Sequence, residues 1–321
     1  MSKEDFRIGK GVRMLTVGEF RAQFGEEAQC AEQLTRQRWP EGFRCPRCAG
    51  STRGYIASRK VHECKLCAYQ CSVTAGTIFH KTRTPLTSWF WAIYRMSHDK
   101  KGISAVQLMK EIGVSYVTAW TMQHKIRKAM EDRDQRYKLH GIIEMDEGYV
   151  GGAESGEGRR GRGAESKCVV GVAVEHAAVG EPGRPSVPGF AALQVLPDAS
   201  SKSIDSFLEA KVAPGSRILS DGWSGYRKLD EKGSEHAATA LSSQAKQAHE
   251  LFPWVHISLF NLKRFLLGTH HQVQPKHLKR YVAEFNYRLN RRTMEPDLLP
   301  RLLRACLGTT TVTFQQLTGE A

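Results

Sequence analysis

The sequence predicts a mixed α/β protein, in which a sheet flanked by helices follows a small metal-stapled module and a helical segment. Three observations lead to this prediction. Two Cys-x-x-Cys pairs lie between residues 45 and 67, and apolar side chains recur at helical spacing over 85–137. After Gly141 the pattern changes to strand-like runs with helices behind them. The 321 residues leave room for two or three domains.

The charge balance indicates a polyanionic partner. Lys and Arg exceed Asp and Glu by 14, which makes nucleic acid the leading candidate. The alternative is a basic surface that is merely solvated. No run of about 18 apolar residues could span a bilayer, and no basic N-terminal segment leads into an apolar stretch. We therefore expect a cytoplasmic protein with no membrane partner.

The N-terminal part of the chain predicts short helices and then a metal module. Residues 14–38 mix apolar and charged side chains as in one or two amphipathic helices, which Trp39 and Pro40 end. From 42 to about 76 the composition shifts to Cys, Arg, Gly and short β-favouring pieces, such as 54–56. Such a composition is typical of a domain held together by a metal ion.

The two cysteine pairs predict a structural zinc site. Cys45 with Cys48, and Cys64 with Cys67, are separated by 15 residues and would offer four thiolates to one tetrahedral ion. We interpret Cys30 and Cys71 as packed residues rather than ligands. The density of basic residues around the pairs favours DNA contact, and the candidates for it are Arg47, Arg59 and Lys60.

The helical segment 85–137 contains a pattern that fits a helix-turn-helix. Gly113 can supply the turn and Ser115 the N-cap of the next helix. In that case Ser115, Tyr116 and Thr118 are candidates for contact with DNA. An ordinary helical hairpin is the alternative.

The remaining chain predicts three strands, a helix, a further strand and two more helices. The expected strands are 142–150, 168–175, 190–196 and 217–220, and the expected helices are 201–212, 253–268 and 275–292. A Gly-rich loop at 154–167 carries Arg159, Arg160 and Arg162. This loop either becomes ordered on a phosphate backbone or is simply solvated.

Two aspartates lie at positions along the expected strands where metal-dependent nucleases carry carboxylate ligands. Asp146 lies in an acidic cluster on the first strand, where burial is unfavourable unless a cation is bound. Asp221 follows the fourth strand, although the Gly after it also reads as a turn. Ribonuclease-H-like nucleases hold two Mg²⁺ ions between carboxylates in this order, and Mg²⁺ prefers oxygen ligands.

A third active-site residue is expected on the helix at 253–268. The candidates are His256 and Asn261. His256 shares a helix face with Lys263, seven residues on, whereas Asn261 lies about 140° away from it. We therefore favour His256, with Lys263 reaching the same phosphate; the alternative is a histidine satisfied inside the helix packing.

Several motifs in one order resemble the ISXO-like insertion-sequence transposases. The resemblance runs from about residue 20 to 292 and is carried by RWP at 38–40, CPRC at 45–48, TAGTIF at 74–79, MDEGYVGG at 145–152, SDGW at 220–223, VH at 255–256, NLKR at 261–264, GTHH at 268–271 and EFNYR at 284–288.

The resemblance implies a ribonuclease-H-like catalytic domain of the DDE type behind a zinc ribbon, acting on DNA at the ends of its own element. By position, Asp146 and Asp221 match the two catalytic aspartates, which hold Mg²⁺ or Mn²⁺, and Lys263 matches the basic residue of the last helix. His256 stands where many relatives have Glu, which could favour Mn²⁺. Weaker candidates are Glu147 and Asn261, and Arg264 is a further candidate for DNA contact.

The resulting expectation is a bacterial transposase that binds terminal repeats, cleaves there and joins the freed end to target DNA. We expect a homo-oligomer on DNA, associated with the nucleoid when bound. Expected divisions of the chain are 1–82 for the ribbon, 83–138 for the helix-turn-helix, 139–295 for the catalytic domain and 296–321 for a C-terminal tail. Two alternatives are a catalytically inactive DNA-binding regulator and a nuclease that does not join strands.

Overall fold

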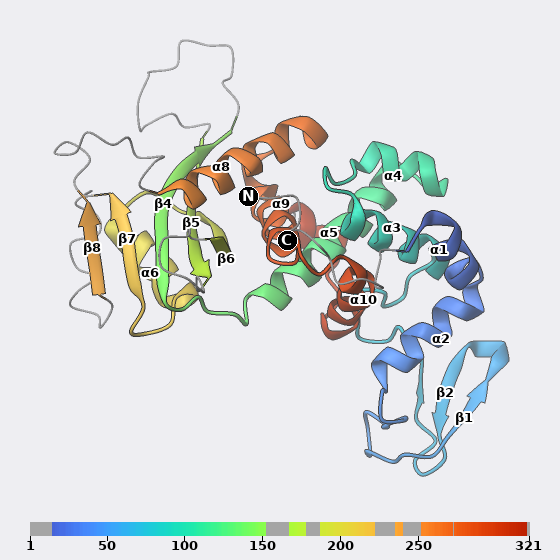
Figure 1. The fold of residues 1–321 in the computed structure, drawn as a ribbon. Helices are drawn as coiled ribbons and strands as arrows, with labels where there is room; N and C mark the ends of the chain where they lie inside the picture. The colour runs from blue at the N-terminus through green and yellow to red at the C-terminus, as the bar shows by residue number, and fades with distance from the viewer. Residues whose placement is uncertain are drawn as a thin grey trace. The chain divides into compact units, whose positions relative to one another are not determined.

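The computed structural model describes residues 15–151, 167–177, 187–221, 235–239, 252–271 and 273–319. The chain folds into two compact units (Figure 1). The first combines Met1–Arg133 with Thr293–Ala321, and the second is Asp134–Arg292. None of the helices formed by the described residues is long and apolar enough to cross a membrane.

The first unit contains the small sheet of the cysteine module. Strands β1 (Arg53–Ile56), β2 (Val61–Cys64) and β3 (Gln70–Cys71) pair antiparallel in that order, with a 3-10 turn at Ala57–Arg59. Little apolar area is available to this sheet, and its core consists of Phe43 and cysteines with Trp39 packed on them. The β-favouring piece predicted at 54–56 is confirmed as β1.

The helices α1 (Val17–Phe24), α2 (Glu27–Arg38) and α3 (Leu86–His98) confirm the predicted N-terminal helices and the start of the helical segment. On α3 the predicted apolar stripe is buried. Glu27 at the start of α2 accepts hydrogen bonds from the backbone of Leu86 and Thr87, at 3.1 and 3.3 Å. This carboxylate supplies acceptors for N–H groups in the first turn of α3 that have no partner within the helix.

Helices α4 (Ala105–Ile112) and α5 (Tyr116–Asp134) have the turn that the sequence predicts between them. Gly113 adopts the left-handed conformation with φ of 66°, which costs little only for glycine. Ser115 accepts a hydrogen bond from the backbone N–H of Thr118 at 3.2 Å, as expected for the residue that caps α5. The local helix-turn-helix geometry is therefore present.

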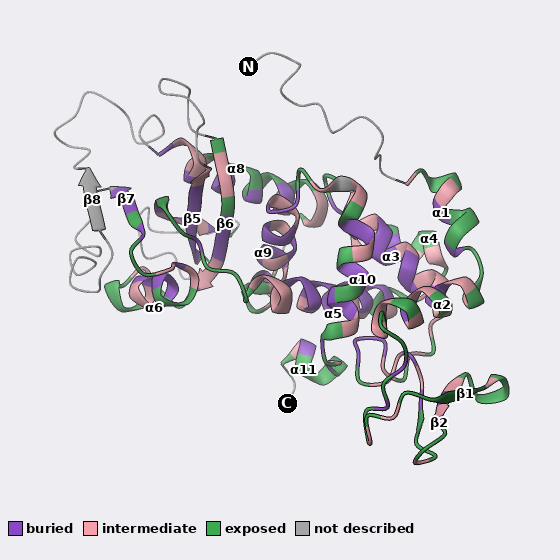
Figure 2. Ribbon diagram, turned by 60° about the horizontal axis from the view of Figure 1, so that its bottom comes forward, coloured by how far each residue is buried: buried purple, intermediate pink, exposed green. Residues whose placement is uncertain are grey.

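The C-terminal residues are helical and packed, not the tail that we expected at 296–321. α10 (Leu298–Gly308) contacts α2 and α3, and α11 (Phe314–Thr318) follows it. The reason is a stripe of leucines at helical spacing on α10, all of them buried: Leu298, Leu299, Leu302 and Leu303. Figure 2, which is coloured by burial, shows buried residues in this part of the first unit.

The second unit is built on a five-stranded sheet with the order β6-β5-β4-β7-β8. Its strands are β4 (Ile142–Val150), β5 (Cys168–Ala177), β6 (Val187–Leu196), β7 (Arg217–Asp221) and β8 (Glu235–Thr239). The first three pair antiparallel, and α6 (Ser201–Lys211) leads to β7, which pairs parallel with β4. This order confirms the predicted ribonuclease-H-like mixed sheet; β8 was not predicted.

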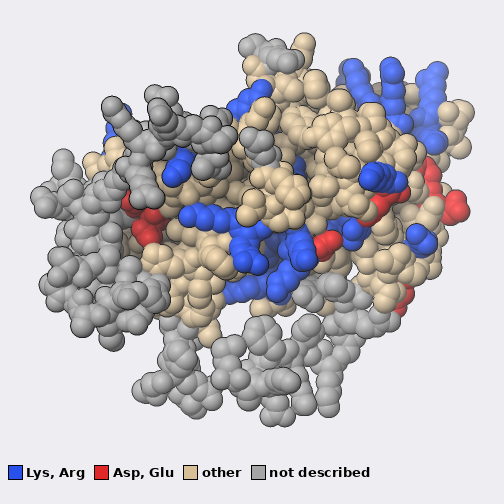
Figure 3. Space-filling view, turned by 90° about the horizontal axis from the view of Figure 1, so that it is seen from above, with Lys and Arg blue, Asp and Glu red and all other residues tan. Residues whose placement is uncertain are grey.

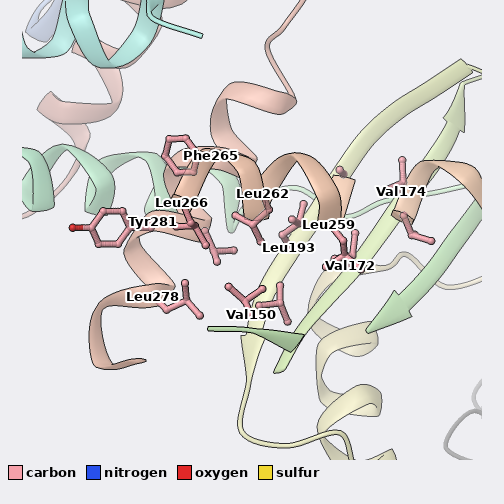
Figure 4. Close-up of a cluster of buried hydrophobic side chains, with 14 of the residues drawn as sticks. Val150, Val172, Val174, Leu193, Leu259, Leu262, Phe265, Leu266, Leu278 and Tyr281 are labelled. Atoms are coloured by element: carbon pink, nitrogen blue, oxygen red, sulfur yellow. The ribbon is translucent and has the colours of Figure 1, made fainter. Parts of the chain in front are cut away.

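Helices cover the two faces of this sheet. α6 packs on one face, over Ile143 and Met145 of β4. On the other face, side chains of α8 (Pro253–Phe265), a π-helical turn (Leu266–His270) and α9 (Pro275–Leu289) form a cluster with the strands (Figure 4). The end of α9 is joined to the edge strand β6, because the Asn290 amide exchanges two hydrogen bonds with the backbone of Ala191, at 2.7 and 2.9 Å.

α8 approaches β4 closely at Gly148. A Cβ at this position would lie 2.7 Å from Cδ2 and 2.8 Å from Cδ1 of Leu259, well inside van der Waals contact. The glycine therefore lets the helix lie directly on the strand. Glu144, Asp146, Gly148 and Val150 alternate onto this face of β4, whereas Glu147 lies on the opposite face.

Candidate active site and metal centre

The four predicted zinc ligands come together. The Sγ atoms of Cys45, Cys48, Cys64 and Cys67 all lie within 4.8 Å of one another. The distance from Cys45 to Cys67 is 3.7 Å and that from Cys48 to Cys64 is 3.6 Å. Four thiolates at the usual Zn–S distance of about 2.3 Å stand about 3.8 Å apart at the corners of a tetrahedron. The cluster has the size and the donor atoms that Zn²⁺ requires.

Both halves of the cluster have the same backbone geometry. Ala49 and Ala68, each just after the second cysteine of a pair, have left-handed φ values of 59° and 54°. Each donates its N–H to the carbonyl of the first cysteine of its pair, at 2.9 Å. The Cys-x-x-Cys spacing thus folds twice into the same tight turn, which directs two sulfur atoms to one point.

The spare cysteines do not join the cluster. Burial raises the pKa of Cys30 to about 12, and burial also raises the pKa of Cys71. Both side chains are buried, and neither belongs to the group of sulfur atoms that lie within 4.8 Å of one another. This agrees with the prediction that they are packed residues.

In the second unit, Asp146 and His256 face each other across the junction of β4 and α8. Nδ1 of His256 lies 3.8 Å from Oδ2 of Asp146, and the two side chains are 33% and 23% exposed. The other oxygen, Oδ1, accepts the backbone N–H of Glu147 at 2.8 Å. A partly accessible carboxylate beside an imidazole is a donor set that a divalent cation can use.

Asp221 is placed by its backbone; its side chain lies outside the described residues. Strand β7 pairs parallel with β4, with Glu144 opposite Leu219. This is the last pair of the ladder, and Asp146 and Asp221 each follow it by two residues on their own strand. The predicted pair therefore lies on neighbouring parallel strands of the sheet.

Glu144 was not among the predicted site residues, and it holds the site together. Its side chain is fully buried, and Oε2 accepts the backbone N–H groups of Trp254 at 2.8 Å and Val255 at 3.2 Å. These N–H groups belong to the first turn of α8, where the helix carries partial positive charge. Oε1 accepts a hydrogen bond from Nε2 of His176 on β5, at 2.8 Å. The only sequence signal was its place two residues before Asp146, on the same face of the strand.

The other predicted active-site residues are distributed around this junction. Lys263 and Asn261 are both exposed on α8, and Arg264 is exposed beside them. Glu147 lies on the face of β4 that is turned away from α8. His256 is thus the candidate on α8 that is observed next to Asp146, as favoured over Asn261.

Most of the predicted DNA contacts that the structure describes are exposed, and Thr118 is half-buried. Arg47, Arg59 and Lys60 lie on the surface of the ribbon. Tyr116 at the start of α5 is 49% exposed. The loop residues Arg159, Arg160 and Arg162 lie outside the described residues.

Family models match both functional parts of the chain. The ISXO2-like transposase domain matches residues 138–290, and the transposase zinc-ribbon domain matches residues 25–70. A protein of Halobacterium salinarum described as an uncharacterized protein in transposable element ISH50 is 30% identical over 224 residues, which are 65% of this chain and 71% of that protein. This chain belongs to the ISXO2-like transposase family.

Two solved structures with low similarity are a pre-cleavage Mos1 transpososome and the Mos1 strand transfer complex. Their sequence identities are 13% and 14%, and their TM-scores are 0.27 and 0.20. Each alignment covers 62% of this chain and 73% of the Mos1 chain. At these scores the likeness carries no argument about the transposase described here.

The cysteine cluster generates a prediction about metal content. The full-length transposase should carry one zinc ion per chain, and Cys64→Ser should lose it, because three thiolates bind the ion far more weakly than four. Elemental analysis by mass spectrometry measures this directly. Cys71→Ser is the matched control and should retain the zinc; loss of zinc from that variant would put Cys71 in the ligand set.

Glu144 generates a prediction about stability. Glu144→Ala leaves two helix N–H groups and the His176 ring without their acceptor, so urea unfolding should show a loss of about 2–5 kcal/mol. Glu144→Gln keeps an acceptor but removes the charge at the helix N-terminus, and should cost about 1 kcal/mol. The exposed Glu209→Gln on α6 should change nothing. An unchanged stability of Glu144→Ala would mean that this carboxylate does not anchor α8.

Proposed function

We propose that this transposase cleaves DNA at the terminal repeats of its own insertion sequence and joins the freed 3′-hydroxyl to target DNA. The observation that carries the proposal is the approach of His256 to Asp146, at 3.8 Å, on a ribonuclease-H-like sheet. Position 221 on the neighbouring parallel strand would complete a site of two aspartates and a histidine.

Asp146 and Asp221 would hold Mg²⁺ or Mn²⁺, with His256 as a third donor. Bound divalent cations of this kind activate the attacking water or hydroxyl and neutralise charge on the phosphate. Phosphoryl transfer requires positioning and charge neutralisation more than covalent chemistry by the protein. The donor set agrees with this role, since carboxylate oxygens suit both Mg²⁺ and Mn²⁺, and Mn²⁺ accepts an imidazole nitrogen more readily than Mg²⁺ does.

The remaining residues at this site position the DNA. Lys263 lies about two turns along α8 from His256 and can bind a phosphate oxygen. Glu144 fixes the first turn of α8, so that His256 and Lys263 keep their orientation toward β4. His256 could also accept a proton from the attacking group, because its ordinary pKa lies near neutrality.

The first unit would hold the terminal repeats. Arg47, Arg59 and Lys60 of the ribbon can pair with phosphates, and the exposed N-terminal turn of α5 offers Ser115, Tyr116 and Thr118 to a DNA groove. The excess of 14 basic over acidic side chains supports such binding. Figure 3 shows Lys and Arg side chains gathered at several places on the face that it draws. We propose that the chain acts as a homo-oligomer on paired element ends.

One observation favours a different role. The family resemblance leads us to expect a carboxylate where this chain has His256, and a neutral imidazole binds Mg²⁺ less readily. A chain that had lost catalysis would still bind DNA through its ribbon and helix-turn-helix, as a regulator. The following experiment separates the two roles.

The purified full-length transposase should join pre-cut DNA ends, taken from the repeats flanking its reading frame, to a plasmid with Mg²⁺ or Mn²⁺. Asp146→Asn should lower the joining rate by at least about a hundredfold, because the metal loses a carboxylate ligand. The control Glu209→Gln should join at the wild-type rate. Specific binding without cleavage under either metal would support the regulator, and cut products that are never joined would support a nuclease.

The identity of the residue at 256 should set the metal preference. His256→Glu should raise the joining rate with Mg²⁺ severalfold relative to that with Mn²⁺, because an oxygen ligand replaces a nitrogen. Parallel assays in the two metals give this ratio. Asn261→Glu adds the same carboxylate on another side of α8 and should leave the ratio unchanged. If Asn261→Glu shifts the ratio and His256→Glu does not, the third ligand is at 261.

A further inference from the structure

The solvent-facing side of α8 exposes large apolar side chains next to the active site. Ile257 is 46% exposed and Phe260 is 59% exposed, and Leu267 in the following π-helical turn is 68% exposed. The buried side of the helix is fully used, since Val255, Leu259 and Leu262 pack in the cluster on the sheet. An aromatic ring that the core does not need is therefore presented to solvent one helical turn from His256.

Phe260 is paired with a cation. The guanidinium carbon of Arg264 lies over its ring, 5.4 Å from the centroid. Residues 256, 260, 263 and 264 fall within about 100° of one another around the helix axis. The aromatic ring, the guanidinium, Lys263 and the histidine that approaches Asp146 therefore share one side of α8.

The charge on the exposed side of α8 distinguishes between the possible binding partners of this surface. The sequence of α8, PWVHISLFNLKRF, contains Lys and Arg but neither Asp nor Glu. A second copy of the chain docked here about a twofold axis would bring the same cations together, which is unfavourable. A nucleic acid offers phosphates for Lys263 and Arg264 and a flat apolar face for Phe260.

We propose that Phe260, backed by Arg264, is a stacking site for one unpaired nucleobase of the DNA strand held at Asp146 and His256. Both faces of a base inside a duplex are covered by its neighbours, so the ring can accept only a base that is unpaired or extruded. Stacking on an aromatic ring is tolerant of sequence, because every base has a π-face. The site would thus bind the separated strand at a DNA end independently of its base sequence. This inference rests on the proposed function.

The test uses full-length transposase without added Mg²⁺ or Mn²⁺ and measures binding of a labelled thymidine oligonucleotide, single-stranded and as a duplex. Phe260→Ala should weaken single-strand binding by between about fivefold and a hundredfold. Duplex affinity should stay within about twofold of wild type, because no phosphate contact is lost. Phe260→Trp should restore single-strand binding, and Ile257→Ala, an exposed apolar control on the same helix, should bind as wild type does.

Two further measurements sharpen the test. The fluorescence of a 2-aminopurine base in the single strand should change on binding wild type and change much less with Phe260→Ala, because stacking alters its emission. The salt dependence of binding should keep its slope in Phe260→Ala, whereas Arg264→Gln should reduce it by up to about 0.7 for one lost phosphate contact.

Either of two results overturns the proposal. One is wild-type single-strand affinity in Phe260→Ala, or an equal loss for single strand and duplex. The other is a wild-type oligomer that dissociates in Phe260→Ala while single-strand binding is unchanged, which would make this side of α8 a contact between copies. Neither result would alter the Asp146 dependence of strand joining, so failure of the stacking site is distinguishable from failure of the proposed function.

Discussion

The hydrogen bonds from the first turn of α8 to Glu144 determine where the candidate active-site residues of this helix lie. A buried carboxylate is costly unless its oxygens are satisfied, and here both are, by two backbone N–H groups and the ring of His176. The negative charge faces the positive end of the helix, which stabilises both. Since Glu144 and Asp146 lie two residues apart on one face of β4, fixing the helix to one fixes His256 near the other.

The packing of α8 on β4 adds to the effect of the hydrogen bonds at Glu144. Gly148 removes the side chain that would hold α8 away from β4, and Leu259 occupies the space. Further along the helix, Leu262 is fully buried in the same cluster. Because one side of α8 packs on the sheet, the orientation of its other side is fixed. The packing therefore also fixes the direction in which the helix presents His256, Phe260 and Lys263. A phosphoryl-transfer site requires residues that are held in such a fixed orientation.

The sequence predicted the local features well because each had its own chemical signal. The two Cys-x-x-Cys pairs predicted the thiol cluster, Gly113 with Ser115 predicted a turn and a cap, and a β-rich run of residues predicted β4 with the observed bounds. The approach of His256 to Asp146 followed from helix periodicity combined with the family resemblance.

What could not be predicted depends on contacts between segments distant in the chain. Nothing local to Glu144 indicates that it will meet Trp254, 110 residues later. The leucines of α10 predict a helix by their spacing, but not that it packs on α2 and α3. β8 has only five residues, and its pairing with β7 comes from the sheet rather than from its own propensity.

The most direct test of a divalent-metal site formed by β4, β7 and α8 is to map which parts of the backbone lie near the bound ion. Fe²⁺ in place of Mg²⁺, with ascorbate and peroxide, produces hydroxyl radicals that cut the protein backbone near the ion, and mass spectrometry maps the cuts. Our account predicts cuts near Asp146, near Asp221 and near His256 in one sample, which excess Mg²⁺ suppresses and which Asp146→Asn lacks. Cuts near Asp146 with none on β7 or α8, or the same cuts in Asp146→Asn, would contradict it.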